Sequence, residues 1–379
     1  MAKNTNLSKA KKEKNDEFYT QMSDVEKELM HYKEHFKNKV VLCNCNDPEW
    51  SAFWKYFHLQ FKALGLKKLI ATTYNEEGLA YKLEYSGGND NDTDVCTKTP
   101  LEGDGDFRNK ECLALLEECD VVVTNPPFSK FREYMALLMQ YQKKFLVIGN
   151  INAVTYKEIF PLIRDNQLWW GISTNGSNRY FRVPDSYELT EKTGKIENGI
   201  KYAFVKGVMW YTNLETGKRH EELVRDLNED YDPEKYPKYD NYDAINVDKV
   251  LKIPRDYYGV MGVPITFLGK YNPDEFEIVA FRKGEDGKDL VFTRDEEREF
   301  NCTFVSLYDV DGRDDKKLRR KNQWEAYLRK NNNQTEIEPI DYFYPLAQST
   351  AGVMNAAYET FVNGKNVYKR ILICQKVGI

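Results

Sequence analysis

The stretch that decides the fold reads Asp120-Val121-Val122-Val123-Thr124-Asn125-Pro126-Pro127-Phe128. Its β-branched residues predict a short buried strand, and the last four residues follow at the carboxyl end of that strand. Open α/β sheets bind their ligands at this end of their strands. Two consecutive prolines fix two φ angles and also restrict Asn125, which precedes them. We therefore expect a stiff ligand-binding loop at the tip of a strand.

The chemistry of this loop is that of a hydrogen-bond acceptor beside an aromatic ring. The side-chain oxygen of Asn125 and the carbonyl groups of Pro126 and Pro127 can accept hydrogen bonds from an amino group, and Phe128 can lie flat against a planar ring. Amino methylation of a base requires this combination, so these four residues are the candidate catalytic group. The alternative is a proline turn that ends a strand and carries an Asn cap.

The rest of the N-terminal half alternates between strand-like and helix-like segments. Strands are predicted at 39–43, 67–73, 119–124 and 144–149, and helices at 23–36, 49–64, 109–118, 130–140 and 156–165. Ser23 with Glu26 predicts a capping box at the first helix. Segment 84–106 is rich in Gly, Asn and Asp, which indicates a hairpin or a long loop. This alternation predicts an α/β fold with a doubly wound, Rossmann-like parallel sheet.

The pattern changes after about residue 170. Segments 168–172, 179–183 and 202–212 are strand-like and predict a sheet that is completed by a late hairpin. From Lys218 the chain becomes charged and rich in tyrosine. We expect three parts, namely a flexible basic arm at 1–15, a domain at 16–215 and a second region, which bears specificity, at 216–379.

Composition limits the class of protein. The 379 residues include no apolar run of the roughly 20 residues that a membrane span needs, and the seven cysteines form no CxxC pair. We therefore expect a cytoplasmic protein without a structural metal. The net charge of −5 argues against indiscriminate nucleic-acid binding but not against binding through local patches. Two basic patches, 9–14 and 313–330, are candidates, or they are merely solvated surface.

The turn after the first strand reads Cys43-Asn44-Cys45-Asn46-Asp47-Pro48. It contains no GxGxxG pattern, which disfavours a dinucleotide because close approach to a pyrophosphate needs glycine. Small polar residues with Asp47 suit a ligand that carries an ammonium and a carboxylate group, such as S-adenosyl-L-methionine. An ordinary Asx turn at 46–48 remains the alternative.

A second candidate contact with the cofactor precedes the helix predicted at 109–118. There Asp106 could accept a hydrogen bond from the adenine amine of the cofactor, and Phe107 could pack on the adenine ring. A plain turn or a helix N-cap is the alternative for this Gly-Asp-rich cluster.

Together these segments resemble the amino-methylating DNA methyltransferases, most closely the EcoRI-type adenine-specific family. The matching runs are Asp16-Glu17-Phe18-Tyr19-Thr20-Gln21, Val41-Leu42-Cys43-Asn44-Cys45-Asn46-Asp47-Pro48, Leu69-Ile70-Ala71-Thr72 and Asn125-Pro126-Pro127-Phe128. The resemblance covers roughly residues 15–215 well. It implies a class I methyltransferase domain, a C-terminal target-recognition region, S-adenosyl-L-methionine as cofactor and double-stranded DNA as substrate. The strand ending at Thr72 lacks the acidic residue that usually binds the cofactor ribose, for which Glu76, Glu77 and Asp47 are candidates.

The resemblance also implies roles for individual residues. Cofactor-binding candidates are Phe18, Tyr19, Thr20, Cys43, Asn44, Asn46, Asp47, Pro48, Thr72, Asp106, Phe107 and Asn125. Substrate-binding candidates are Phe128, Tyr180, Phe181, Lys316, Lys317, Arg319 and Arg320. The target adenine would leave the duplex, since its amine is inaccessible in the stack, and Tyr180 or Phe181 would cover the base opposite Phe128. The alternative for segment 177–182 is an amphipathic edge strand without a role in binding the base. A monomeric bacterial or phage enzyme is implied, with a companion restriction endonuclease as a possible partner.

Two alternative functions stay open from the sequence. The same chemistry could act on RNA, on a cytosine amine or on a glutamine side chain of a protein, because Asn-Pro-Pro loops serve all three. The missing glycines and the missing ribose-binding acid are instead compatible with an inactive methyltransferase fold that only binds DNA.

Overall fold

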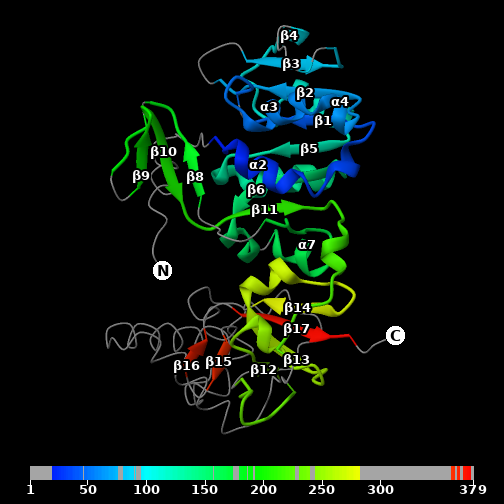
Figure 1. Ribbon diagram of the computed structural model, residues 1–379, viewed down its shortest axis with the longest axis vertical. Coiled ribbons are helices and arrows are strands. Elements are labelled where there is room, and N and C mark those ends of the chain that lie inside the picture. Colours follow the sequence, from blue (N-terminus) through cyan, green and yellow to red (C-terminus); the bar gives the residue numbers. More distant parts are fainter. Residues whose placement is uncertain are drawn as a thin grey trace, which may run out of the picture. The chain divides into compact units, whose positions relative to one another are not determined.

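The computed structural model describes most of the first 281 residues and three short stretches near the C-terminus. The described ranges are 19–45, 47–75, 80–88, 90, 95–156, 158–173, 179–185, 187–190, 193–226, 230–239, 244–281, 360–362, 365–367 and 370–376. Contacts divide the chain into two compact units, Met1–Lys218 and Arg219–Ile379 (Figure 1).

The first unit is built on an eight-stranded sheet. Its strands are β1 (Val40–Cys43), β2 (Lys68–Thr72), β3 (Tyr81–Tyr85), β4 (Thr97–Pro100), β5 (Val121–Thr124), β6 (Lys144–Asn150), β7 (Trp169–Trp170) and β11 (Val208–Thr212). They run in the order β4-β3-β2-β1-β5-β6-β11-β7. The central pairs β2–β1, β1–β5 and β5–β6 are parallel, and the outer pairs are antiparallel. The sheet is therefore mixed, and the predicted α/β class is confirmed.

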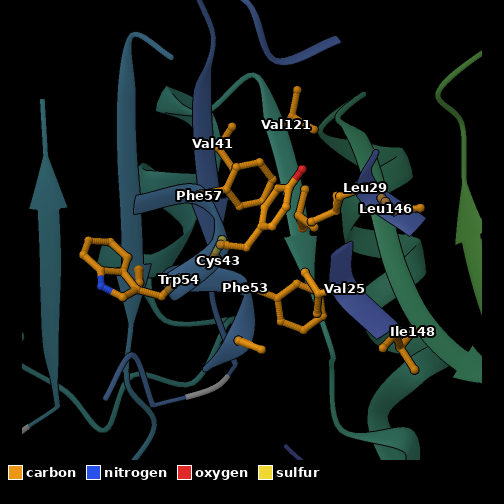
Figure 2. Close-up of a cluster of buried hydrophobic side chains, with 14 of the residues drawn as sticks. Val25, Leu29, Val41, Cys43, Phe53, Trp54, Phe57, Val121, Leu146 and Ile148 are labelled. Carbon is orange, nitrogen blue, oxygen red and sulfur yellow. The ribbon is translucent and has the colours of Figure 1, made fainter. Parts of the chain in front are cut away.

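The central strands are buried on both faces, as their β-branched composition predicts. In β5, Val121 and Val123 join the core on one face, while Val122, which points to the other face, has no exposed surface. Figure 2 shows the first of these cores, where Val25 and Leu29 of one helix and Phe53 of another approach the sheet. Burial on both faces fixes the register of these strands, and with it the position of every residue at their carboxyl ends.

Six helices accompany this sheet in the described part of the first unit. They are α2 (Met22–Leu29), α3 (Ala52–Leu59), α4 (Phe61–Leu64), α5 (Lys110–Glu118), α6 (Phe131–Gln140) and α7 (Phe160–Arg164). Aromatic residues dominate the contacts on the face of α2 and α3; Phe36 and Phe57 meet edge to face with their centroids 4.9 Å apart. The predicted helices are thus present, although several are shorter than expected.

The first helix differs most from its prediction. It begins at Met22, with Gln21 as N-cap, and ends at Leu29, before a 3-10 turn at Lys33–Phe36. Because Ser23 lies inside the helix, the predicted Ser23–Glu26 capping box is wrong. The amide nitrogen of Gln21 instead donates to the Tyr180 carbonyl at 2.7 Å.

Other helices and strands also begin or end at residues that differ from the prediction. The helix predicted at 49–64 is two helices, α3 and α4, and ends at Gly65 with a left-handed φ of 63°. The helix predicted at 156–165 is shortened to α7. The hairpin predicted within 84–106 is formed by β3 and β4, and it begins earlier, at Tyr81.

A separate three-stranded sheet of the first unit lies to one side of the large sheet in Figure 1. It consists of β8 (Arg179–Arg182), β9 (Gly194–Glu197) and β10 (Ile200–Val205) in the order β8-β10-β9. The strand predicted at 202–212 is in fact two strands, β10 and β11, because Gly207 turns the chain with a φ of 70°. Tyr19 pairs with Arg182 through two backbone hydrogen bonds of 2.9 and 3.0 Å, so the N-terminal segment is anchored to β8.

The second unit contains a four-stranded and a two-stranded sheet. The strands β12 (Ala244–Asn246), β13 (Val260–Pro264), β17 (Arg370–Gln375) and β14 (Phe276–Phe281) form the larger sheet in this order, and β15 (Thr360–Val362) pairs with β16 (Lys365–Val367). The basic patches 9–14 and 313–330, including Lys316, Lys317, Arg319 and Arg320, lie outside the described residues. No helix in the described part of the chain is long and apolar enough to cross a membrane.

Candidate active site

The Asn125 loop and the turn after β1 leave the sheet side by side. Strands β1 and β5 are parallel neighbours, with Val41 opposite Val121, so their carboxyl ends share one edge. There the Thr124 hydroxyl donates a hydrogen bond to the Asn44 carbonyl. Asn125 is the next residue and is 5% exposed. The start of the Asn125 loop is therefore fixed against the turn predicted to hold the cofactor.

Tyr134 of α6 adds a second link to the same turn. Its hydroxyl donates to Asn44 Oδ1 at 2.6 Å, and its ring meets Phe107 edge to face with centroids 5.0 Å apart. Burial raises the pKa of Tyr134 far above its ordinary value, so the phenol remains a neutral donor. The sequence reasoning missed Tyr134 because it lies on the apolar stripe of α6, where it is indistinguishable from a core residue.

Asp106 carries the densest set of charged contacts in the site. Its Oδ1 accepts hydrogen bonds from the backbone N–H of Arg108 at 3.0 Å and from Arg108 Nε at 2.8 Å. Its Oδ2 accepts from Arg108 Nη2 and Lys130 Nζ, both at 2.8 Å. Burial by itself would raise the pKa of Asp106, but the hydrogen bonds from Arg108 and Lys130 outweigh it and hold the pKa well below its usual range. Asp106 is therefore a carboxylate at neutral pH.

The turn that holds Asp106 packs closely against the end of β2. Gly105 has a φ of 78°, and a Cβ placed on it would lie 1.9 Å from the Thr73 carbonyl oxygen, so only glycine fits. Asp104 stabilises the turn by accepting the Asp106 N–H at 3.0 Å and the Asn109 side chain at 2.7 Å. The plain turn that the sequence offered as an alternative is thus present at Asp104, and it brings Asp106 and Phe107 to the site.

Two predicted cofactor residues have buried hydroxyls that no group in the described part of the chain satisfies. Thr20 is 6% exposed and Thr72 is 1% exposed, and among the described residues neither Oγ1 has a hydrogen-bond partner. A buried hydroxyl without a partner is costly in free energy and usually marks a position where a ligand or water completes the bonding. These hydroxyls fit a polar ligand at the ends of β2 and the Tyr19 segment.

The remaining predicted cofactor residues fall into three groups. Asp47 Oδ1 accepts the Glu49 N–H at 2.9 Å, as in an Asx turn, and also the Tyr81 hydroxyl at 3.3 Å. Cys43 and Pro48 are buried, and burial raises the pKa of the Cys43 thiol, which stays protonated. Phe18, Asn46, Glu76 and Glu77 lie outside the described residues.

On the substrate side, Tyr180 and Phe181 point to opposite faces of β8. Phe181 has no exposed surface and supports Phe128, whose ring meets it edge to face with centroids 6.4 Å apart. Tyr180 is half-buried, 4.9 Å from the Phe204 ring, and Lys195 Nζ lies 4.9 Å from its centroid. Of the two residues predicted to cover the base, Tyr180 is the one with accessible surface, as the amphipathic-strand alternative also requires.

Acceptor oxygens and aromatic rings lie at the carboxyl ends of parallel strands, around an Asn-Pro-Pro-Phe loop, which is the arrangement expected of an amino-group methyltransferase. The family model described as "Adenine-specific methyltransferase EcoRI" matches residues 6–376. The chain belongs to this family.

Individual relatives agree with this assignment. The chain is 49% identical over 302 residues to the Type II methyltransferase M.EcoRI of Escherichia coli, which covers 76% of this chain and 93% of the relative. It is 43% identical over 278 residues to the Type II methyltransferase M.MpnI of Mycoplasma pneumoniae, and the match covers 72% of this chain and 84% of the relative. It is 42% identical over 278 residues to the Type II methyltransferase M.MgeORF184P of Mycoplasma genitalium, and the match covers 72% of this chain and 85% of the relative. The predicted family and the predicted activity, adenine-specific DNA methylation, are confirmed.

Proposed function

We propose that this chain binds S-adenosyl-L-methionine and an extruded adenine of double-stranded DNA at the edge where β1, β2 and β5 end. The observation that carries the proposal is the position of Asn125, buried beside Asn44 at that edge and fixed by the Thr124 hydroxyl. The parallel strand order β2-β1-β5-β6 supports a Rossmann-like class I methyltransferase architecture for this unit.

The cofactor would be held by groups from four segments. Thr20 and Thr72 offer the buried hydroxyls described above, and the turn at Asn44–Asp47 offers oxygen acceptors for an ammonium group. Phe107 can pack on the adenine ring beside the Asp106 carboxylate. When bound, the cofactor supplies an electrophilic methyl group. The chain's own contribution is to orient the acceptor nitrogen.

The reaction would rest on positioning more than on acid–base catalysis. The Asn125 side-chain oxygen would accept one hydrogen of the adenine amine and the Pro126 carbonyl the other. These two bonds localise the nitrogen lone pair and aim it for in-line transfer. The prolines keep both acceptors still, because their φ angles are fixed.

The adenine would leave the duplex to reach this loop, since its amine is stacked inside B-DNA. Phe128 would stack on the extruded base, with Phe181 behind it holding the ring in place. Tyr180 is the candidate for the other side of the base. Its half-buried ring lies on the face of β8 that also carries Arg182.

We further propose that the region 216–379 recognises the target sequence and that the enzyme acts as a monomer. Basic residues there would contact phosphates, and phosphate contacts position a protein without reading sequence. Lys316, Lys317, Arg319 and Arg320 are the candidates by sequence. A restriction endonuclease acting on the same site is the expected companion, in keeping with relatives named Type II methyltransferases.

Transfer of labelled methyl groups onto unmethylated duplex DNA, followed by nucleoside analysis, tests the proposal. Wild-type protein should label adenine, and Asn125→Ala should lower the rate at least about 100-fold, because misplacing a reacting group by 1 Å costs about that much. Asn150→Ala, at the end of the neighbouring strand β6, is the matched control and should stay active.

The other outcomes separate the alternatives. Label in RNA, cytosine or protein would keep the chemistry and change the substrate. Failure of calorimetry to detect cofactor binding would indicate an inactive fold, and full activity of Asn125→Ala would remove Asn125 from the mechanism.

A further inference from the structure

Lys130 is a charged residue of the catalytic loop that the mechanism above does not use. It ends the 3-10 turn Phe128–Lys130, directly after the Asn-Pro-Pro-Phe motif. Its ammonium group lies 2.8 Å from Asp106 Oδ2, 5.6 Å from the Tyr74 ring centroid and 5.9 Å from that of Phe107. The loop thus reaches across to the wall of the proposed cofactor site.

This ion pair is better protected from water than a typical surface pair. The side chain of Lys130 is 32% exposed and that of Asp106 is 9% exposed, whereas the neighbouring pair of Arg132 and Glu158 is 56% and 36% exposed with 3.9 Å between the charged atoms. Exposed pairs contribute little, and shorter, desolvated pairs fix geometry more strongly. The Lys130 contact is therefore able to hold the loop in place.

The loop is held at both of its ends. Before Asn125, the Thr124 hydroxyl binds the Asn44 carbonyl. After Phe128, Lys130 binds Asp106, and its own N–H donates to the Pro127 carbonyl at 3.0 Å. Because the φ angles of both prolines are fixed, fewer torsions remain between Lys130 and Asn125 that could absorb a displacement of Lys130.

We propose that Lys130 is a positioning residue for methyl transfer, which acts through its ion pair with Asp106 to align Asn125 and the Pro126 carbonyl with the cofactor. This inference rests on the proposed role of the Asn125 loop. Lys130 touches neither substrate nor reacting atoms in this arrangement. Its loss should therefore lower the rate of transfer and leave the affinity for the cofactor nearly unchanged.

The test compares variants of the full-length protein in single-turnover transfer to duplex DNA, with S-adenosyl-L-methionine and DNA both saturating. Lys130→Met should lower the rate at least about 10-fold, because small misalignments of reacting groups are costly. Its calorimetric dissociation constant for the cofactor should stay within about 3-fold of wild type. Lys130→Arg should recover most of the rate, since a guanidinium group can also bind Asp106.

Two comparisons guard against a merely structural effect. Arg132→Met removes an exposed ion pair of α6, the helix that begins directly after Lys130, and should keep the wild-type rate. In an Asp106→Asn background, Lys130→Met should have little further effect on the rate, because the pair that it breaks is already weakened. If Lys130→Met fails to fold, which thermal unfolding would reveal, the saturated rate of the single Asp106→Asn variant, which weakens the same ion pair, decides the question together with that of Lys130→Arg.

Three results would overturn the inference. A wild-type rate in Lys130→Met contradicts it while leaving the proposed function intact, provided that Asn125→Ala is inactive in the same assay. Weaker cofactor binding at an unchanged saturated rate would make Lys130 a cofactor ligand instead. Absence of transfer to DNA by the wild-type protein would overturn both the inference and the proposed function.

Discussion

Glu28 and Asp106 are both buried in the first unit, yet their carboxyl groups receive different donors. Glu28 is fully buried, and within the described part of the chain its hydrogen-bond donors are all neutral. They are the Tyr32 hydroxyl at 2.9 Å, the Ile172 N–H at 2.8 Å, the Ser173 N–H at 2.6 Å and the Ser173 hydroxyl. These bonds join α2 to the segment that follows β7. Position 171 must be glycine for the Glu28 carboxyl group to fit, since a Cβ on Gly171 would lie 2.2 Å from Glu28 Oε1.

Asp106, in contrast, receives two cations, one from its own turn and one from the catalytic loop. Neutral backbone and hydroxyl donors fix the Glu28 carboxyl group within the fold, while charged side chains connect Asp106 to the proposed cofactor site and to the Asn125 loop. Burial alone therefore does not distinguish the two carboxyl groups; the source of their hydrogen-bond donors does. We expect changes at Glu28 to act on stability and changes at Asp106 to act on binding and rate.

The largest expected effect is on the Glu28 side. Glu28→Ala leaves the two backbone N–H groups of Ile172 and Ser173 and the Tyr32 hydroxyl without their acceptor in a buried place. It should lower the free energy of unfolding by at least about 3 kcal/mol, because each of the three unsatisfied groups costs about 1–3 kcal/mol. Urea unfolding measures the change. Glu26→Ala, exposed on the same helix, should stay within about 0.5 kcal/mol, and equal effects of the two variants would refute the prediction.

A smaller effect, of a different kind, is expected at Asp106. Asp106→Asn keeps the shape of the side chain but removes the charge that Arg108 and Lys130 share. The affinity for S-adenosyl-L-methionine should fall about 10- to 100-fold by calorimetry, while the free energy of unfolding drops by less than about 2 kcal/mol. Asp104→Asn in the same turn is the control and should bind normally. If Asp106→Asn bound the cofactor with wild-type affinity, the proposed contact between Asp106 and the cofactor would be refuted.

The smallest expected effect is the dependence of stability on acid pH. The pKa of Asp106 is lowered in the folded protein, so its contribution is complete above the ordinary Asp pKa of about 3.9. That contribution is lost as the pH falls toward the folded value. Between pH 5 and pH 3 wild type should therefore lose stability more steeply than Asp106→Asn, by at most about 1.4 kcal/mol per pH unit. Parallel slopes in urea titrations would contradict this assignment.

The sequence predicted the parts of the site that depend on local pattern. The β-branched run Val121–Thr124 and the prolines after it were sufficient to place Asn125 at a strand end, since composition and fixed φ angles act over a few residues. The turn at Asp104–Phe107 was recognised for the same reason. Strands β1, β2 and β6 likewise lie where apolar runs predicted them.

What the sequence could not give are contacts between distant segments. Glu28 and Ser173 are 145 residues apart, and Tyr134 and Asn44 are 90 apart. Nothing local marks either pair, because Glu28 resembles any helical glutamate and Tyr134 any core aromatic residue. The wrong capping box shows the same limit: Gln21, which is the actual N-cap, is held by the Tyr180 carbonyl, a partner 159 residues along the chain.

The anchoring of Tyr19 and Gln21 on β8 has a consequence for synthesis on the ribosome. Gln21 and its partner Tyr180 are separated by 159 residues. At roughly 5–20 residues per second, the N-terminal segment waits roughly 8–32 seconds for the strand that receives it. By then β1, β2, β5 and β6 have already been translated, so the sheet can form while one wall of its ligand site is still missing. A nascent chain therefore completes the proposed cofactor site only after residue 182 has left the exit tunnel.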